Sequence, residues 1–188
     1  MLLFHTGFSE IPSPDVAHGR RNADFGPGFY LSDSEAFSRR WARERSGSET
    51  VVNRYELETE GLLIREFQRD GDWFEYISRN RAGFPDSLKD YDVIAGPIAN
   101  DTIYDTWGIL TSGLLPPQTA LQLLCLGNEY RQIVIKTERA TKHLRFLSAY
   151  RMNHEEISSY RETVRQEERA YQLMIRESLG DLLKMIES

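Results

Sequence analysis

The sequence contains a single cysteine, Cys125, among 188 residues. A disulfide framework within the chain is therefore excluded, as is a zinc site built from several cysteines. Cys125 lies in an apolar run at 123–126, which favours a buried small hydrophobic residue over a reactive thiol. The 4 histidines show no His-x-x-x-His or Glu-x-x-His spacing, so we expect no metal site.

Long hydrophobic runs and an excess of positive charge are also missing. No apolar stretch approaches the roughly 18 residues of a membrane span, and the first residues lack the basic region of a secretory signal. We therefore expect a reduced, soluble, cytoplasmic protein with no membrane partner. Lys and Arg total 23 against 29 Asp and Glu, and a net charge of −6 argues against a generic binder of phosphate backbones.

The remaining composition is that of a folded domain, with 40% hydrophobic and 11% aromatic residues. Strand and helix patterns are mixed, which predicts an α+β fold. We expect strands at 2–5, 29–31, 51–57, 62–67, 91–96, 131–136 and 143–147. We expect helices from a Ser32 or Ser34 cap to about 46, and at 72–81, 103–110 and 117–126. The inner face of the first of these helices would carry Phe37, Trp41 and Ala42.

The last part of the chain differs from the rest. From residue 153 onward glycine almost vanishes, charge rises, and apolar residues recur at helical spacing. The pattern predicts a long amphipathic helix that could break near Gly180. We divide the chain into a domain at 1–148 and a helical tail at 149–188. The tail could cover the core, associate with itself or dock on a partner, and packing on its own domain is the commoner outcome.

Several short motifs gain meaning from their order along the chain. They are FHTG at 4–7, GR at 19–20, DFGPGFY at 24–30 and WA at 41–42. Together they resemble the first half of an ADP-ribosyltransferase domain, in the branch with diphtheria toxin and the poly(ADP-ribose) polymerases, whose triad is His-Tyr-Glu. With YDVIAGPIAND at 91–101 and QIVIKTERA at 132–140, the chain looks more narrowly like a bacterial, toxin-like family on that fold. The resemblance covers residues 1–148 and implies split antiparallel β-sheets with flanking helices.

The resemblance assigns roles to individual residues. It implies that His5 hydrogen-bonds a ribose of NAD, and that the backbone at Thr6 and Gly7 clamps the nicotinamide amide. Thr6 stands where the family pattern has glycine, and its side chain narrows the pocket. Tyr30 would stack on the nicotinamide ring, and Gly28, in the turn before it, would be a further cofactor-binding residue. Arg20 would reach the pyrophosphate or adenosine side of NAD.

The third triad position falls on Gln132, at the start of the strand 133–135. Glu129 is the rival, because NEY at 128–130 also echoes the polymerase motif, although a solvated loop acid is the plainer interpretation of Glu129. We prefer Gln132 because it immediately precedes the β-branched strand. A glutamine keeps the hydrogen bonds of a glutamate and loses its charge.

This resemblance implies an NAD-consuming enzyme. Breaking the nicotinamide–ribose bond builds positive charge on the ribose, and an aromatic face suits the cationic ring. We expect mono-ADP-ribosyl transfer from NAD to an unknown acceptor macromolecule or nucleotide. An NAD glycohydrolase, or an NAD- or ADP-ribose-binding protein without turnover acting through its C-terminal helix, stays open. The resemblance also implies a toxin-type or conflict-system enzyme, with an antitoxin or self-association through residues 153–188.

Overall fold

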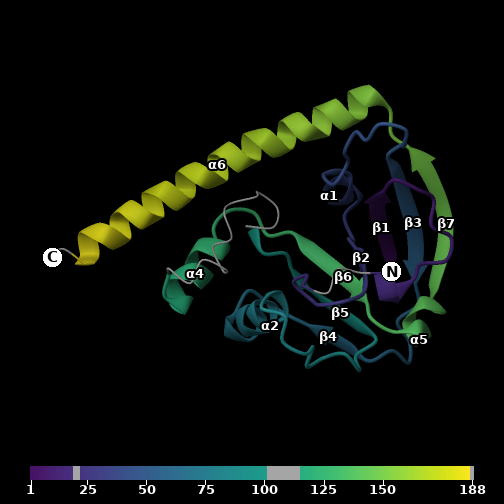
Figure 1. Cartoon of the computed structure of the whole chain (residues 1–188), viewed down its shortest axis with the longest axis horizontal. Coiled ribbons are helices and arrows are strands. Elements are labelled where there is room, and N and C mark those ends of the chain that lie inside the picture. Colours follow the sequence, from purple (N-terminus) through teal and green to yellow (C-terminus); the bar gives the residue numbers. More distant parts are fainter. Residues whose placement is uncertain (19–21, 101–114, 187–188) are drawn as a thin grey trace.

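The computed structural model describes residues 1–18, 22–100 and 115–186, and its fold is α+β with two sheets (Figure 1). The first sheet is antiparallel, in the order β1 (Leu2–Gly7), β3 (Val51–Leu57) and β7 (Leu144–Arg151). The second sheet has the order β2 (Phe29–Leu31), β6 (Arg131–Ile135), β5 (Val93–Pro97) and β4 (Ile64–Glu66). Its β4–β5 pair is parallel and its other pairs are antiparallel.

The two sheets join at a single bridge between Phe4 and Ser32. The Phe4 amide donates to the Ser32 carbonyl at 2.8 Å, and the Ser32 amide donates to the Phe4 carbonyl at 2.9 Å. The other edge of β1 pairs with β3, and the other edge of β2 pairs with β6. The sheets therefore separate on either side of this bridge while sharing one apolar core, which contains Leu3, Phe29, Tyr55, Ile133 and Ile135.

Two further apolar clusters cover the remaining faces. One packs α2 (Gly71–Arg81) and α4 (Pro117–Leu124) on the four-stranded sheet through residues that include Trp73, Ile77 and Leu124. The other joins β1 and β3 to the start of α6 (His154–Ile186) through residues that include Phe4 and Ile157. Among the described helices, none has the length and apolar character that crossing a membrane requires.

The long helix α6 runs past α1 (Glu35–Arg39) toward α4 and extends beyond it (Figure 1). Its Tyr171 side chain is fully buried, and the hydroxyl donates to the Leu123 carbonyl at 3.0 Å. Packing on its own domain, the commoner of the expected outcomes, is thus what the helix shows. The expected break near Gly180 is wrong, since α6 is continuous there.

Several expected boundaries shift. The helix expected to reach residue 46 ends at Arg39, because the amides at 40–42 bond to carbonyls three residues back and the tighter turns carry Ala42 into the core. Ser34 caps this helix. The first strand continues to Gly7 and the last to Arg151, so the boundary at 148 cuts a strand. The helix expected at 103–110 lies outside the described residues. Two short elements were not expected, a 3-10 turn (Val16–His18) and α5 (Glu138–Thr141).

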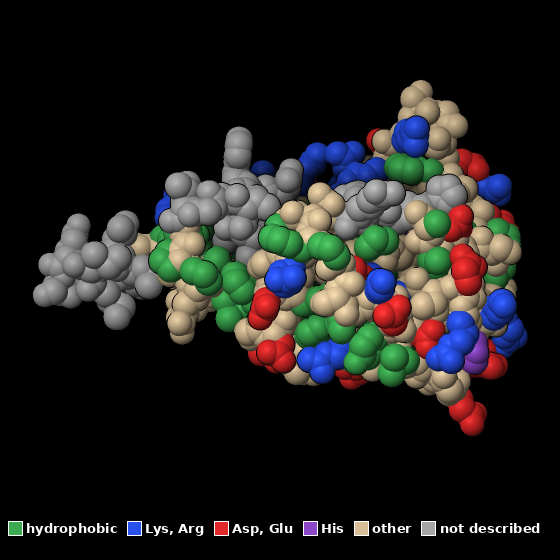
Figure 2. All heavy atoms as spheres, turned by 60° about the horizontal axis from the view of Figure 1, so that its bottom comes forward, with side chains coloured by type: hydrophobic (Ala, Val, Ile, Leu, Met, Phe, Trp, Pro, Cys, Tyr) green, Lys and Arg blue, Asp and Glu red, His purple; other side chains and the backbone are tan. Residues whose placement is uncertain are grey.

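The surface carries both charge signs. Figure 2 shows acidic and basic side chains interspersed on the face that it presents, with hydrophobic side chains between them. A broad basic patch is not visible on that face, in keeping with the net charge of −6.

Candidate functional site

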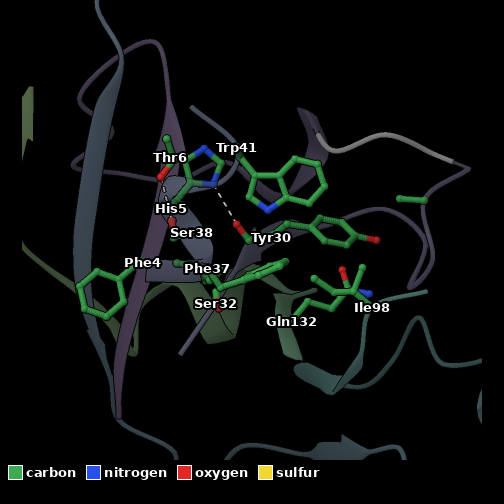
Figure 3. Close-up of a pocket in the computed structure, with 12 residues that line it drawn as sticks. Phe4, His5, Thr6, Tyr30, Ser32, Phe37, Ser38, Trp41, Ile98 and Gln132 are labelled. Carbon is green, nitrogen blue, oxygen red and sulfur yellow. Dashed lines mark hydrogen bonds between the residues drawn. The ribbon is translucent and has the colours of Figure 1, made fainter. Parts of the chain in front are cut away.

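A pocket of about 340 Å³ opens where β1 and β2 diverge beside the bridge between the sheets (Figure 3). Segments far apart in the sequence contribute its walls: β1, β2, β6 and the turn that follows α1. Its lining residues are Phe4, His5, Thr6, Ala23, Tyr30, Leu31, Ser32, Phe37, Ser38, Trp41, Ile98 and Gln132. Three of them, His5, Tyr30 and Gln132, are the residues of the predicted triad.

His5 is held at the pocket wall by its neighbours on β1 and β2. Its Nδ1 lies 2.8 Å from the Tyr30 carbonyl oxygen, and its ring packs on Phe29 with centroids 4.7 Å apart. A carbonyl can only accept, so Nδ1 carries the hydrogen in this bond. Burial lowers the pKa of His5, which the bond to the Tyr30 carbonyl only partly offsets. His5 is therefore neutral near pH 7, and its Nε2 is a hydrogen-bond acceptor.

Tyr30 contributes its ring to the pocket and its hydroxyl to the preceding turn. The hydroxyl donates to the Gly26 carbonyl at 2.7 Å and accepts from the Phe25 amide at 3.1 Å. Lys136 also stabilises this turn, because its ammonium group donates to the Phe25 carbonyl and pairs with Asp86. The hydroxyl of Tyr30 is thus a structural anchor, while Tyr30 also belongs to the pocket lining.

Gln132 is the buried polar residue of the pocket. It is the second residue of β6, is 6% exposed, and its Nε2 has no hydrogen-bond partner among the described residues. A buried amide without a partner costs on the order of 1–3 kcal/mol, so such groups usually have a ligand or water to meet. The unpaired nitrogen therefore indicates a place where a ligand acceptor can bind.

Glu129, the rival for the third position, lies outside the pocket lining. Its side chain is 53% exposed and pairs with Arg69, whose Nε lies 3.6 Å from the carboxylate. Arg69 also donates to the Asn128 and Cys125 carbonyls, so it fixes the loop that carries Glu129. The structure brings Gln132, and not Glu129, together with His5 and Tyr30.

Thr6 and Ser38 close one side of the pocket with a hydrogen bond of 2.8 Å between their hydroxyls. This hydrogen bond ties β1 to α1 at the pocket wall. Gly7 is not among the lining residues, but it lies against the His5 ring, since a Cβ there would be 3.1 Å from the His5 Nε2. Gly7, expected to contact the nicotinamide amide, therefore lies beside His5 and outside the pocket lining.

Gly28 serves β-sheet packing and does not line the pocket. Its φ is +154°, and a Cβ would lie 2.6 Å from both the Ile135 carbonyl oxygen and the Val134 side chain. Gly28 was expected to bind the cofactor; instead, its missing side chain lets β2 approach β6 closely. Arg20, expected near the pyrophosphate, lies outside the described residues.

Two polar residues of the 91–101 motif lie away from the pocket. Asp92 accepts from the Leu63 amide at 2.8 Å and the Thr137 hydroxyl at 2.6 Å, and it pairs with Arg139. Chiefly because Arg139 donates to it, the pKa of Asp92 falls to about 2. Asn100 is fully buried, donates to the Leu126 carbonyl and accepts from Arg69. Both side chains therefore serve the structure and do not belong to the pocket lining.

The aromatic residues near α1 are placed differently from what the sequence pattern predicts. Trp41 was expected on the inner face of a helix, yet it is 39% exposed and lines the pocket, while Phe37 is buried beside it. The signal for Trp41 was its place in the WA motif at 41–42. Ser38 also lines the pocket and carried no sequence signal, whereas Ile98, another lining residue, lies in the motif at 91–101.

The pocket is electrically neutral among the residues described. No Asp, Glu, Lys or Arg belongs to its described lining, and its polar side-chain groups are hydroxyls, one imidazole, one indole N–H and one amide. Groups of His, Cys, Asp and Glu able to hold a metal ion are likewise absent from the described part of the chain. The site is therefore suited to a ligand with a flat aromatic portion and neutral hydrogen-bonding groups.

Comparison with known proteins supplies a family and no function. The comparison with curated proteins finds no match. Residues 1–146 match the family described as "Protein of unknown function (DUF3990)", and the chain belongs to that family.

Proposed function

We propose that the chain is an NAD-dependent mono-ADP-ribosyltransferase whose nicotinamide pocket is the one between β1 and β2. The observation that carries the proposal is the convergence of His5, Tyr30 and Gln132, from three separate segments, on one pocket. Two sheets that touch at a single bridge also support the split-sheet architecture that the sequence resemblance implies.

The lining residues fit the nicotinamide end of NAD. The ring of Tyr30, with Trp41 across the same pocket, offers aromatic surface to a flat cationic ring (Figure 3). The neutral Nε2 of His5 can accept from a ribose hydroxyl. The buried Nε2 of Gln132 can donate a hydrogen bond to an oxygen of the ribose, which would give this nitrogen the partner that it lacks among the described residues.

The reaction breaks the bond between the nicotinamide nitrogen and ribose C1′. The bonding electron pair leaves with nicotinamide, and the ribose carbon becomes cationic until an acceptor nucleophile attacks it and loses a proton. Here the chain's own residues bind and orient: they fix the ribose hydroxyls and the leaving ring and exclude water from the apolar wall. The acceptor is a macromolecule or nucleotide, and a toxin-type role with a neutralising partner is part of the same proposal.

A second candidate is binding of NAD or ADP-ribose without turnover. Gln132 at the third position favours it, because an amide cannot stabilise the ribose cation as a carboxylate would, and no carboxylate belongs to the described lining. NAD hydrolysis, with water as the acceptor, is the third outcome that the same pocket permits.

The test is to incubate the protein with NAD labelled on its adenylate portion, with and without cell extract. Transfer predicts released nicotinamide and a labelled acceptor, and loss of both by at least about tenfold in His5→Ala and Gln132→Ala. Nicotinamide without a labelled acceptor indicates hydrolysis. Calorimetric binding without release indicates the binding protein. Glu129→Ala is the matched control and should behave as wild type. If NAD neither binds nor reacts, the proposal fails.

A further inference from the structure

The Glu167 carboxylate of the long helix α6 contacts two segments that carry pocket-lining residues. Glu167, in the middle of α6, pairs with Arg40 and accepts a hydrogen bond of 3.0 Å from the Tyr130 hydroxyl. Arg40 follows α1, whose residues Phe37 and Ser38 line the pocket. Tyr130 lies two residues before Gln132. The carboxylate therefore joins one wall of the pocket, at α1, to another, at β6.

The side chains between α6 and the pocket are in direct contact. The Arg40 guanidinium lies 4.6 Å from the centroid of the Tyr130 ring, and that ring stacks on Phe37 at 4.6 Å. Phe37 in turn meets Trp41 edge to face at 6.2 Å. A displacement of Glu167 thus has a continuous packed route to the two aromatic residues on the α1 side of the pocket.

This contact matters because α1 is only five residues long. A helix this short cannot hold its own conformation, so its place depends on what packs against it. The Arg40 side chain is only 9% exposed, so its ion pair with Glu167 is poorly screened by water and removing the Glu167 charge should shift the position of Arg40. A second contact from α6, between the Tyr160 hydroxyl and Arg39 at 3.3 Å, supports the same short helix.

We propose that Glu167 is a positioning residue of the pocket, through which α6 sets the separation of the α1 wall and the β6 wall. Residues beyond the family match at 1–146 are then part of the ligand site and not an appendage. The proposal concerns the shape of the pocket. Only its affinity readout rests on the proposed function.

Glu167→Gln in the full chain tests this, because it keeps the shape of the side chain and removes its charge. Fluorine NMR of protein carrying 5-fluorotryptophan reports on the α1 wall, with the Trp41 signal assigned by its loss in Trp41→Phe. We expect the Trp41 signal to shift, the buried Trp73 signal and the helix content to stay, and NAD to bind about tenfold more weakly. Glu162→Gln, an exposed position on the same helix, is the matched control and should change none of these.

An unchanged Trp41 signal in a folded Glu167→Gln protein overturns the proposal, whatever NAD does. If wild type does not bind NAD, the proposed function fails while the Trp41 signal still decides the role of Glu167. Should Glu167→Gln fail to fold, Tyr130→Phe decides instead. It removes only the hydroxyl that meets Glu167 and keeps the ring between Arg40 and Phe37, and it should move the Trp41 signal in the same direction by less. No movement in Tyr130→Phe then overturns the proposal.

Discussion

At the scale of single residues, the imidazole of His5 determines how the pocket responds to pH. Burial lowers its pKa below the usual 6.5. The unfolded chain therefore takes up a proton first as the pH falls, and the neutral His5 costs stability only below about pH 6.5. We expect NAD binding to be constant from pH 8 to 6.5 and to weaken below that, as Nε2 becomes protonated.

An NMR titration of the His5 ring protons checks this directly, with His5→Gln to assign the signal. The predicted midpoint lies below 6.5. A midpoint at or above 6.5 would contradict the effect of burial on the pKa of His5, and a midpoint above 7 would show that the imidazole is mostly cationic near neutrality and cannot accept from a ribose hydroxyl.

Tyr30 separates into two functions that two substitutions can distinguish. Tyr30→Phe removes the hydroxyl that serves Gly26 and Phe25 and keeps the ring, so we expect a stability loss of about 1–2 kcal/mol with NAD binding retained in the folded protein. Tyr30→Ala should lose both this stability and the binding of NAD. Urea unfolding and calorimetry measure the two effects. Equal loss of binding in both variants would place the hydroxyl at the ligand.

At the scale of elements, the strand β2 depends on a glycine that lets it approach β6. Gly28→Ala adds a Cβ 2.6 Å from the Ile135 carbonyl oxygen at a φ of +154°. We expect it to destabilise the protein by about 2–4 kcal/mol, because backbone must move. Gly61→Ala is the matched control, with a φ of +77° and open space, and should cost about 1 kcal/mol. Denaturant unfolding of both variants tests this, and similar losses would contradict it.

Sequence patterns predicted the elements that carry their own signals. The helical spacing of Trp73, Tyr76 and Ile77 predicted α2 almost to the residue, although its Asp70 cap was not predicted. The predicted length of α1 was wrong because contacts outside the helix hold the segment that follows it. The Thr50 hydroxyl, for example, donates a hydrogen bond to the Arg43 carbonyl. The four residues of α5 are too few for a periodic pattern to emerge.

The site was predictable in part for a similar reason. His5, Tyr30 and Gln132 stood in motifs whose order the sequence shows, and the structure brings them to one pocket. Other features depend on how β1, α1 and α6 are placed relative to one another. They are the position of Trp41 at the pocket, the hydrogen bond between Thr6 and Ser38, and the ion pair between Arg40 and Glu167. No local pattern encodes such distances.

At the scale of the whole molecule, Asp92 ties β5 to the segments around Leu63, Thr137 and Arg139. Its folded pKa of about 2 lies below the usual 3.8, so its contribution is complete above about pH 4 and is lost as the pH falls toward 2. Asp92→Asn should be less stable at pH 7 and lose less stability on acidification. Unfolding free energies from pH 6 to 2 measure this. Parallel pH profiles for the two proteins would contradict it.

The central claim is that His5, Tyr30 and Gln132 form a pocket for the nicotinamide end of NAD. A crystal structure of the protein grown with saturating NAD tests it most directly. The account predicts the nicotinamide ring against Tyr30 and a ribose hydroxyl within hydrogen-bond distance of the His5 Nε2, with the Gln132 amide bonded to the same ribose. A dinucleotide bound elsewhere, a nicotinamide ribose that meets Glu129 in place of Gln132, or an empty pocket would contradict it.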